Sequence, residues 1–258
     1  MLMSIFWLQQ TVADVPAENA WLCANETLRL SEMKFIKRRN DWLLGRWTAK
    51  CAIAAYLGWR VESSVLDHIE IRAATSGAPE PFIAEQRTAL GVSLSHCAGR
   101  AIAALVPSGA AVGCDLEKIE PRVDAFVSDY FTAEEQLLVQ NMPAPSRPAL
   151  VTLLWSAKES ALKALGEGLR LDTRSISVDL GDERKISGHL PAGFQMPRRL
   201  GIHHALCPPG QACWLPLQVC CRDTGRAFHG WWQANTDLVR TLVTAAPLPP
   251  PVLLNPRL

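Results

Sequence analysis

The chain has 258 residues, 26 Lys and Arg against 25 Asp and Glu, a formal net charge of +1, and 48% apolar residues. The apolar content excludes a largely disordered chain, and the balanced charge disfavours nucleic-acid or membrane-surface partners. No segment approaches the ~20 apolar residues of a membrane-spanning helix, and the first ten residues lack the pattern of a secretory signal. We therefore expect a cytoplasmic protein with no nucleic-acid or membrane partner, and we expect it to be a monomer.

The eight cysteines are scattered, and no Cys-x2-Cys pair is present that would form half of a zinc site. Several lie within apolar stretches, where a free thiol behaves as a small apolar side chain. In the expected compartment these thiols are predicted to be reduced.

Apolar residues at helical spacing predict a helix over residues 28–59, with Gly58 as its stop signal. Its polar side is basic, because residues 29–50 contain seven Lys or Arg and two acids. The basic residues are Arg29, Lys34, Lys37, Arg38, Arg39, Arg46 and Lys50. The last three are offset by seven and four residues, so they share one face of the helix.

Alternation and tight turns then predict three short strands, over residues 91–96, 101–106 and 111–119. A helical region follows over 122–140, with a break near Phe131. After a proline-containing linker, a strong helix is predicted from about residue 150 to 165, where glycine ends it.

Residues 175–221 are typical of short strands and turns, and the proline-rich residues from 245 onward predict an extended or mobile appendage. Each half of the chain thus offers a helix and several strands, which indicates an α+β fold with two lobes. The expected parts are an N-terminal lobe over 1–108, a C-terminal lobe over 109–222 and a C-terminal extension over 223–258.

Charge differs between the two halves, since residues 115–135 contain seven acids and two bases. A basic helix in one lobe and an acidic stretch in the other suit a site that binds a polyanion through a divalent cation. The alternative is two independently solvated charged faces.

Asp115 and Glu117 project from the same face of the predicted strand, because strand side chains alternate. Two carboxylates at this spacing can converge on one hard cation such as Mg²⁺. An alternating strand with acids on its solvent face is also ordinary, so this pair alone does not identify a metal site.

Trp155, Glu159 and Lys163 line one face of the second predicted helix at i, i+4 and i+8. A surface ion pair between Glu159 and Lys163 would explain the two charges. Trp155 shares their stripe, however, which indicates that the charged pair is partly buried. A half-buried carboxylate beside a lysine favours a metal or phosphate site.

Together these residues resemble the 4′-phosphopantetheinyl transferases of the larger, pseudo-dimeric, surfactin-synthetase-activating type. The matching segments are Gly113-x-Asp115-x-Glu117, Trp155-Ser156-x-Lys158-Glu159-Ser160-x-x-Lys163, Ser93-x-Ser95-His96, Gly166-x-Gly168-Leu169 and the basic helix. Each segment is weak alone, and their combined spacing over residues 28–180 makes the pattern specific. The resemblance implies two similar α+β lobes related by a pseudo-twofold axis, with the active site in the cleft between them.

The implied activity is that of a holo-[acyl-carrier-protein] synthase type enzyme. It moves the phosphopantetheine arm of coenzyme A to a serine of an apo acyl or peptidyl carrier protein and releases adenosine 3′,5′-bisphosphate. By resemblance, Asp115, Glu117 and Glu159 hold Mg²⁺, with Mn²⁺ as the alternative metal. Glu159 is the implied base for the serine proton, and Lys163 the implied contact to the α-phosphate.

The implied contacts to coenzyme A are Arg39, Arg46, Lys50, Gly77, Pro79, Ser95, His96, Asp115, Lys158 and Lys163. Lys158 points away from the Glu159 face, so we expect it to meet solvent, ligand or partner. The turn Gly77-Ala78-Pro79 lacks the cation that the family commonly carries at its centre, which predicts one missing contact to coenzyme A.

Carrier-protein docking is expected around residues 131–140 and the adjoining helix, through basic and apolar side chains. Two other readings remain open at this point. One is a metal-dependent phosphodiesterase or nuclease, which an Asp-x-Glu pair with a distant Glu and Lys also suits. The other is a catalytically lapsed relative that binds a carrier protein or coenzyme A, which the missing cation at Ala78 suggests.

Overall fold

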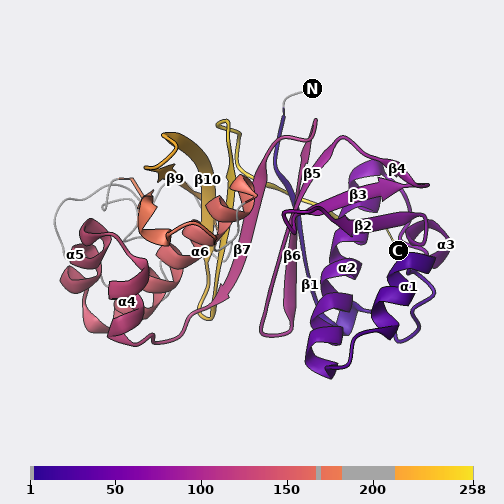
Figure 1. Ribbon diagram of the computed structural model, residues 1–258, viewed down its shortest axis with the longest axis horizontal. Helices are drawn as coiled ribbons and strands as arrows, with labels where there is room; N and C mark the ends of the chain where they lie inside the picture. The colour runs from indigo at the N-terminus through magenta and orange to yellow at the C-terminus, as the bar shows by residue number, and fades with distance from the viewer. Residues whose placement is uncertain (1–2, 167–169, 182–212, 258) are drawn as a thin grey trace. The chain divides into compact units, whose positions relative to one another are not determined.

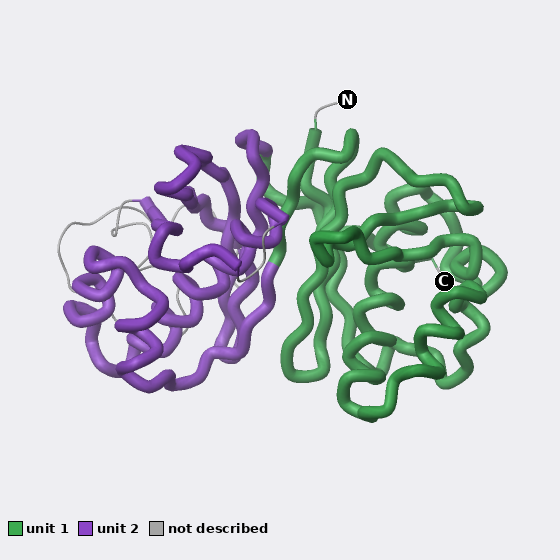
Figure 2. The backbone as a smooth tube through the Cα atoms, viewed as in Figure 1, with its two compact units in different colours: residues 1–114, 249–258 green, residues 115–248 purple. Residues whose placement is uncertain are grey.

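The computed structural model describes residues 3–166, 170–181 and 213–257. The chain forms two compact units, which Figure 2 colours separately: unit 1 is residues 1–114 and 249–258, and unit 2 is residues 115–248. Both units contain helices and sheets, so the expected α+β class is confirmed. A site between the lobes stays a prediction. None of the helices that the structure describes has the length and apolar character needed to cross a membrane.

Unit 1 contains a four-stranded sheet in the order β12-β1-β6-β5, a three-stranded sheet in the order β2-β3-β4, and helices α1 to α3 (Figure 1). Its elements are β1 (Phe6–Thr11), η1 (Val12–Asp14), α1 (Ala24–Ser31), α2 (Ile36–Leu57), α3 (Ser63–Leu66), β2 (Ile69–Ala73), β3 (Pro79–Ile83), β4 (Gln86–Arg87), β5 (Leu90–Cys97), β6 (Arg100–Pro107) and β12 (Val252–Leu253). Helix α2 packs on β1 and β6 through small and apolar side chains such as Ala49, Cys51 and Ile53, which are fully buried. Burial of this face holds the helix on the sheet.

The single helix expected over residues 28–59 is two helices, α1 and α2, and the prediction of one continuous helix is wrong. Phe35 has the extended backbone of an N-cap residue, and α2 begins after it. Gly58 ends α2 with a φ of 74°, and its N–H bonds back to the carbonyls of Ala54 and Ala55. Glycine takes this left-handed conformation without a Cβ clash, as expected for the stop signal.

The proline-rich C-terminal residues were expected to be extended or mobile; they are extended at β12, but residues 249–258 belong to unit 1 and are not an appendage. Strand β12 pairs in parallel with β1, with Phe6 opposite Val252 and Trp7 opposite Leu253. The next residue, Leu254, is only 8% exposed and packs in the unit 1 core. An edge strand tolerates adjacent prolines because only one of its sides needs backbone hydrogen bonds.

Unit 2 contains one five-stranded sheet in the order β7-β11-β10-β9-β8, with α6 packed on β11 and α5 packed against α6 (Figure 1). Its elements are β7 (Val112–Lys118), which begins within unit 1, α4 (Asp124–Tyr130), α5 (Ala133–Asn141), η2 (Ala144–Ser146), α6 (Arg147–Leu165), η4 (Thr173–Ser175), β8 (Ile176–Asp179), β9 (Leu215–Cys221), β10 (Arg226–Ala234) and β11 (Leu238–Thr244). Helix α6 starts earlier than expected, because Pro148 is tolerated in its first turn.

Residues 226–244, which we expected in a separate C-terminal extension, form the inner strands β10 and β11 of this sheet. Their apolar side chains, such as Phe228, Trp232 and Leu242, are fully buried, as expected for inner strands of a sheet. The division between the units falls at residues 114 and 115 rather than after residue 108. Cys23, Cys51, Cys97, Cys114, Cys220 and Cys221 are free thiols, as expected, whereas Cys213 is disulfide-bonded.

The C-terminal strand yields a stability prediction. Leu254→Ala removes a buried side chain from the unit 1 core, so we expect the free energy of unfolding to fall by about 2–3 kcal/mol. Leu253→Ala is the matched control, because Leu253 is 52% exposed, and a change within about 0.5 kcal/mol is expected. Chemical denaturation measures both, and equal effects would contradict the burial of this segment.

Candidate functional site

Asp115 and Lys163 bring together the two parts of the sequence motif. Asp115 lies on β7 and is 3% exposed, and its carboxylate accepts a hydrogen bond from the Lys163 ammonium at 2.7 Å. Lys163 lies in the last turn of α6, which packs on β11, the neighbour of β7 in the sheet. The buried Asp115 carboxylate is thus neutralised by an ammonium that is itself still partly exposed to solvent.

Glu117 lies on the same strand and is held by neighbours from two directions. Its carboxylate accepts a hydrogen bond from the Trp155 side chain on α6 and lies 3.4 Å from the Arg122 guanidinium. Burial, followed by the charge of Asp115, raises the pKa of Glu117 to about 7, although Arg122, Trp155 and Lys163 oppose the shift. Near neutral pH this carboxyl therefore exchanges readily between its two protonation states.

Glu159 lies on α6 one turn before Lys163 and is half-buried. Burial and then the charge of Asp115 raise its pKa, while Lys163 lowers it. Among the residues that the structure describes, its buried Oε1 atom has no hydrogen-bond partner. An unsatisfied buried carboxylate oxygen is costly, so the position fits a group that brings positive charge.

The three acids offer an oxygen-only donor set, which is what a hard divalent cation such as Mg²⁺ takes. The raised pKa values of Glu117 and Glu159 and the unsatisfied Glu159 oxygen show an excess of acid that a cation would relieve. Within residues 3–166, 170–181 and 213–257, no three Asp, Glu, His or Cys side chains are already grouped as a metal cage. The three acids thus match such a cation in donor chemistry, although the described residues do not yet group them around one point, and Lys163 provides the positive charge beside Asp115.

Lys158 does not meet solvent, ligand or partner, so that expectation is wrong. It is completely buried, and its ammonium contacts the Glu135 carboxylate at 2.8 Å. The same ammonium donates to the carbonyls of Thr173 at 2.8 Å and Ile176 at 2.6 Å. Helical periodicity placed Lys158 off the Glu159 face correctly, but it did not reveal that this other face is covered by α5, η4 and β8.

Lys50 is likewise buried in unit 1 and is not available to coenzyme A, contrary to expectation. Its ammonium pairs with the Glu26 carboxylate and donates to the carbonyl of Trp21 at 2.9 Å. Arg46, one turn earlier, has a side chain 16% exposed and lies 3.9 Å from the same carboxylate. Lys50 alone neutralises the Glu26 carboxylate, so the positive charge of Arg46 is in excess at this point of α2.

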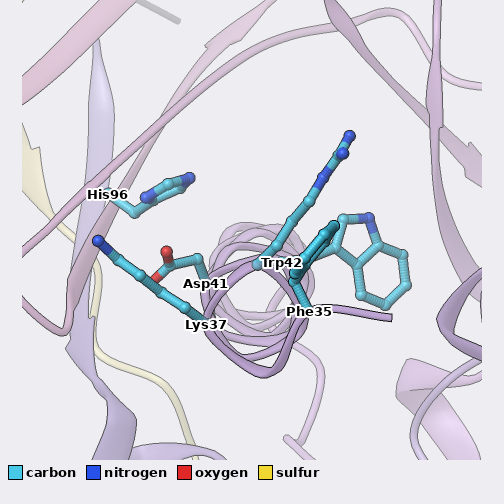
Figure 3. A pocket seen from close by; sticks show the side chains of 6 residues that line it. Phe35, Lys37, Asp41, Trp42 and His96 are labelled. Carbon is cyan, nitrogen blue, oxygen red and sulfur yellow. The ribbon is translucent and has the colours of Figure 1, made fainter. Parts of the chain in front are cut away.

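His96 lines a pocket of about 530 Å³ in unit 1, together with residues from the start of α2. Figure 3 shows its ring across from Lys37 and Asp41, and the rings of Trp42 and of the N-cap residue Phe35 lie on the other side of the helix. Arg38 completes the lining.

The other expected contacts to coenzyme A in unit 1 do not line this pocket. Arg39 and Ser95 are half-buried, Gly77 lies in the exposed turn before β3 with a φ of 88°, and Pro79 begins β3. The motif segment at 167–169 lies outside the described residues.

Sequence reasoning missed several contributions to the site. Lys37 and Arg38 were visible only as members of a basic run, because their approach to His96 depends on how α2 packs on the sheet. The hydrogen bond from Trp155 to Glu117 has no local signal at all. Ser156 and Ser160 join α6 to the sheet, because both hydroxyls hydrogen-bond with buried Thr241 on β11, at 2.9 and 2.6 Å. Their i, i+4 spacing, which puts them on one helix face, was the only signal of this role in the sequence.

Comparison with known proteins places these residues in a family context. The sequence model of the 4′-phosphopantetheinyl transferase superfamily matches residues 111–207. The chain is 29% identical over 155 residues to the 4′-phosphopantetheinyl transferase psf-1 of Bacillus pumilus, a match that spans 60% of this chain and 62% of that protein. It is 30% identical over 98 residues to the holo-[acyl-carrier-protein] synthase of Campylobacter jejuni, spanning 35% of this chain and 80% of that protein.

Among solved structures, the holo-[acyl-carrier-protein] synthase of Thermotoga maritima is 21% identical, with a TM-score of 0.33 over 48% of this chain and 80% of that chain.

The raised pKa of Glu117 predicts a pH-dependent stability. Between the ordinary carboxyl pKa and about 7, the folded state binds more protons than the unfolded state, so stability falls as pH rises. In the absence of divalent cations, Glu117→Gln removes this loss and should raise the free energy of unfolding at pH 8 by about 1 kcal/mol. The variant should show less slope from pH 5 to pH 8 in chemical denaturation.

Glu120→Gln is the matched control, because Glu120 contacts the same Arg122 guanidinium at 3.5 Å but is nearly half exposed. We expect its effect to stay within about 0.5 kcal/mol. An equal gain in the free energy of unfolding in both variants, or a loss in Glu117→Gln at pH 8, would contradict the raised pKa of Glu117.

Proposed function

Because the chain belongs to the 4′-phosphopantetheinyl transferase superfamily, we propose that it transfers the phosphopantetheine arm of coenzyme A to a serine of an apo acyl or peptidyl carrier protein. The observation that carries this proposal is the contact of Asp115 on β7 with Lys163 on α6. The contact joins Asp115 to one ammonium in unit 2, and the charge of Asp115 also acts on Glu117 and Glu159. Such a set suits a pyrophosphate substrate, whose charge must be neutralised during transfer.

In the proposed reaction, the serine oxygen attacks the phosphorus that carries the phosphopantetheine arm. A serine O–P bond forms, the bridging O–P bond breaks, and adenosine 3′,5′-bisphosphate leaves. Glu159 accepts the serine proton, and its raised pKa favours this role near neutral pH. Lys163 neutralises charge on the leaving phosphate. Mg²⁺ held by Asp115, Glu117 and Glu159 would add charge neutralisation at the pyrophosphate when bound.

The unit 1 pocket is our proposed site for the anionic adenosine-phosphate end of coenzyme A. His96, Lys37 and Arg38 line it and are exposed, so their charges are accessible to a phosphate. Lys50 is left out of this set because it is fully buried against Glu26. The roles of Arg39, Arg46, Gly77, Pro79 and Ser95 rest on the motif alone.

Exposed apolar side chains around α4 and α5 support the proposed carrier-docking region. Val123 is 73%, Leu137 59% and Tyr130 38% exposed. The sequences of α4 and α5 contain no Lys or Arg, so docking here would be apolar rather than basic. Arg122, just before α4, is the nearest basic residue in the sequence.

The proposed base yields the decisive assay of this function. Wild-type protein incubated with coenzyme A, Mg²⁺ and several apo carrier proteins should add one phosphopantetheine group to a carrier, read by intact mass. Glu159→Gln should lower the transfer rate by about 10³-fold or more, because the serine proton has no acceptor. Glu62→Gln is the control, because Glu62 is an exposed carboxylate in unit 1, and its rate should be unchanged.

Hydrolysis of coenzyme A without any acceptor would contradict the proposed transfer, and full activity of Glu159→Gln would contradict the assignment of the base.

The phosphate pocket yields a second assay. His96→Ala and Lys37→Ala should each raise the KM for coenzyme A about tenfold, which corresponds to loss of about 1.4 kcal/mol of binding. With dephospho-coenzyme A, which lacks the 3′-phosphate, the same variants should differ little from wild type. Arg29→Ala is the control, since Arg29 is an exposed α1 residue paired with Glu32. An unchanged KM in the two pocket variants would remove the pocket from the proposal.

A further inference from the structure

The two units contain the same buried ion pair, although only unit 2 carries the acidic site. The unit 1 clasp is Glu26 on α1 with Lys50 on α2, and the unit 2 clasp is Glu135 on α5 with Lys158 on α6. Both lysines are 0% exposed, and both glutamates are below 5%. Each lysine lies eight residues before the glycine that ends its helix, Gly58 or Gly166.

The glutamates make matching contacts with the backbone. Glu135 accepts from the N–H of Thr132 at its own helix start and from the N–H of Val178 on β8, at 2.9 and 3.0 Å. Glu26 accepts in the same way from Cys23 at its helix start and from Ile71 on β2, at 3.3 and 3.1 Å. In each unit one carboxylate thus ties a short helix to a strand that follows the long helix.

The unit 2 clasp fixes the long helix more completely than its counterpart does. The Lys158 ammonium contacts three acceptors: the Glu135 carboxylate and the carbonyls of Thr173 and Ile176. These contacts join α6 to α5, η4 and β8. An aromatic ring lies under the ammonium in both units, Phe131 at 5.5 Å from Lys158 and Trp21 at 5.4 Å from Lys50, so the difference lies in the hydrogen bonds. A side chain held at this many points allows α6 neither to slide nor to rotate without breaking buried polar contacts.

The residue that follows each clasp lysine differs between the units. In unit 2 it is Glu159, and in unit 1 it is Cys51. Burial raises the pKa of the Cys51 thiol to about 12, so this position in unit 1 is uncharged. Unit 1 therefore has a clasp with no acid next to its lysine, whereas in unit 2 Glu159 directly follows the clasp lysine. The unit 1 clasp can thus serve as a control for the unit 2 clasp.

We propose that the Glu135–Lys158 clasp is a positioning device that sets the axial register of α6, and so the places of Glu159 and Lys163 relative to Asp115. This inference rests on the proposed function. Glu135 and Lys158 do not touch the substrate in the proposed reaction, because both are buried. The unit 1 clasp holds its helix through one carbonyl fewer and positions no acid.

The test compares two neutral double variants, Glu135→Gln/Lys158→Met and Glu26→Gln/Lys50→Met, which remove a buried ion pair without leaving a lone charge. Both should lower Tm by several degrees, by similar amounts. Only the unit 2 variant should lose about 100-fold or more in kcat, with the KM for coenzyme A within about threefold of wild type. The unit 1 variant should keep kcat within about threefold.

A readout independent of activity is Mn²⁺ binding to each folded protein, followed by electron paramagnetic resonance. The unit 2 variant should bind Mn²⁺ at least about tenfold more weakly than wild type, and the unit 1 variant should bind it normally. If a double variant does not fold, Glu135→Gln and Glu26→Gln replace the pair, because Lys158 then retains its two carbonyl acceptors.

Equal kcat and equal Mn²⁺ affinity in the two variants would overturn the positioning role, whether both fell or both were preserved. If wild-type protein transfers nothing to any carrier, the proposed function fails. The Mn²⁺ comparison still decides the positioning role in that case.

Discussion

The candidate site depends on one contact between distant parts of the chain, the hydrogen bond from Lys163 to Asp115. Asp115 is almost fully buried on β7, where an uncompensated carboxylate would cost several kcal/mol. The compensation comes from α6, so the site exists only when α6 lies against the sheet. Even with Lys163 in place, the pKa values of Glu117 and Glu159 stay raised. The site is therefore rich in acid and short of positive charge, which is the condition that a cation and a phosphate substrate would exploit.

The two units use one structural frame for different chemistry. Each has a short helix, a long helix ended by glycine, and a buried Glu–Lys pair that joins them. Unit 1 places a neutral thiol, Cys51, beside its buried lysine and exposes basic residues at the start of α2. Unit 2 places Glu159 at that point and adds the acids of β7. In our proposal, unit 1 binds the anionic end of coenzyme A and unit 2 performs the transfer.

Sequence periodicity predicted the parts of the site that depend on local geometry. The strand bearing Asp115 and Glu117 and the helix bearing Glu159 and Lys163 both occur where the pattern indicated. Periodicity failed where a side chain's role depends on what covers it. Lys158 and Lys50 look like solvent-facing cations, since buried lysines are rare, and only the tertiary structure supplies Glu135 and Glu26 as partners. The inner strands β10 and β11 were missed for the same reason, because their place in the sheet depends on long-range pairing with β7 and β9.

The central claim is that acids from β7 and α6 bind one divalent cation. A crystal structure of the protein with Mn²⁺ and coenzyme A, with anomalous scattering measured from the metal, tests it most directly. The account predicts a single anomalous peak within coordinating distance of Asp115, Glu117 and Glu159. A peak bound elsewhere, or none at these carboxylates while coenzyme A is in place, would contradict it.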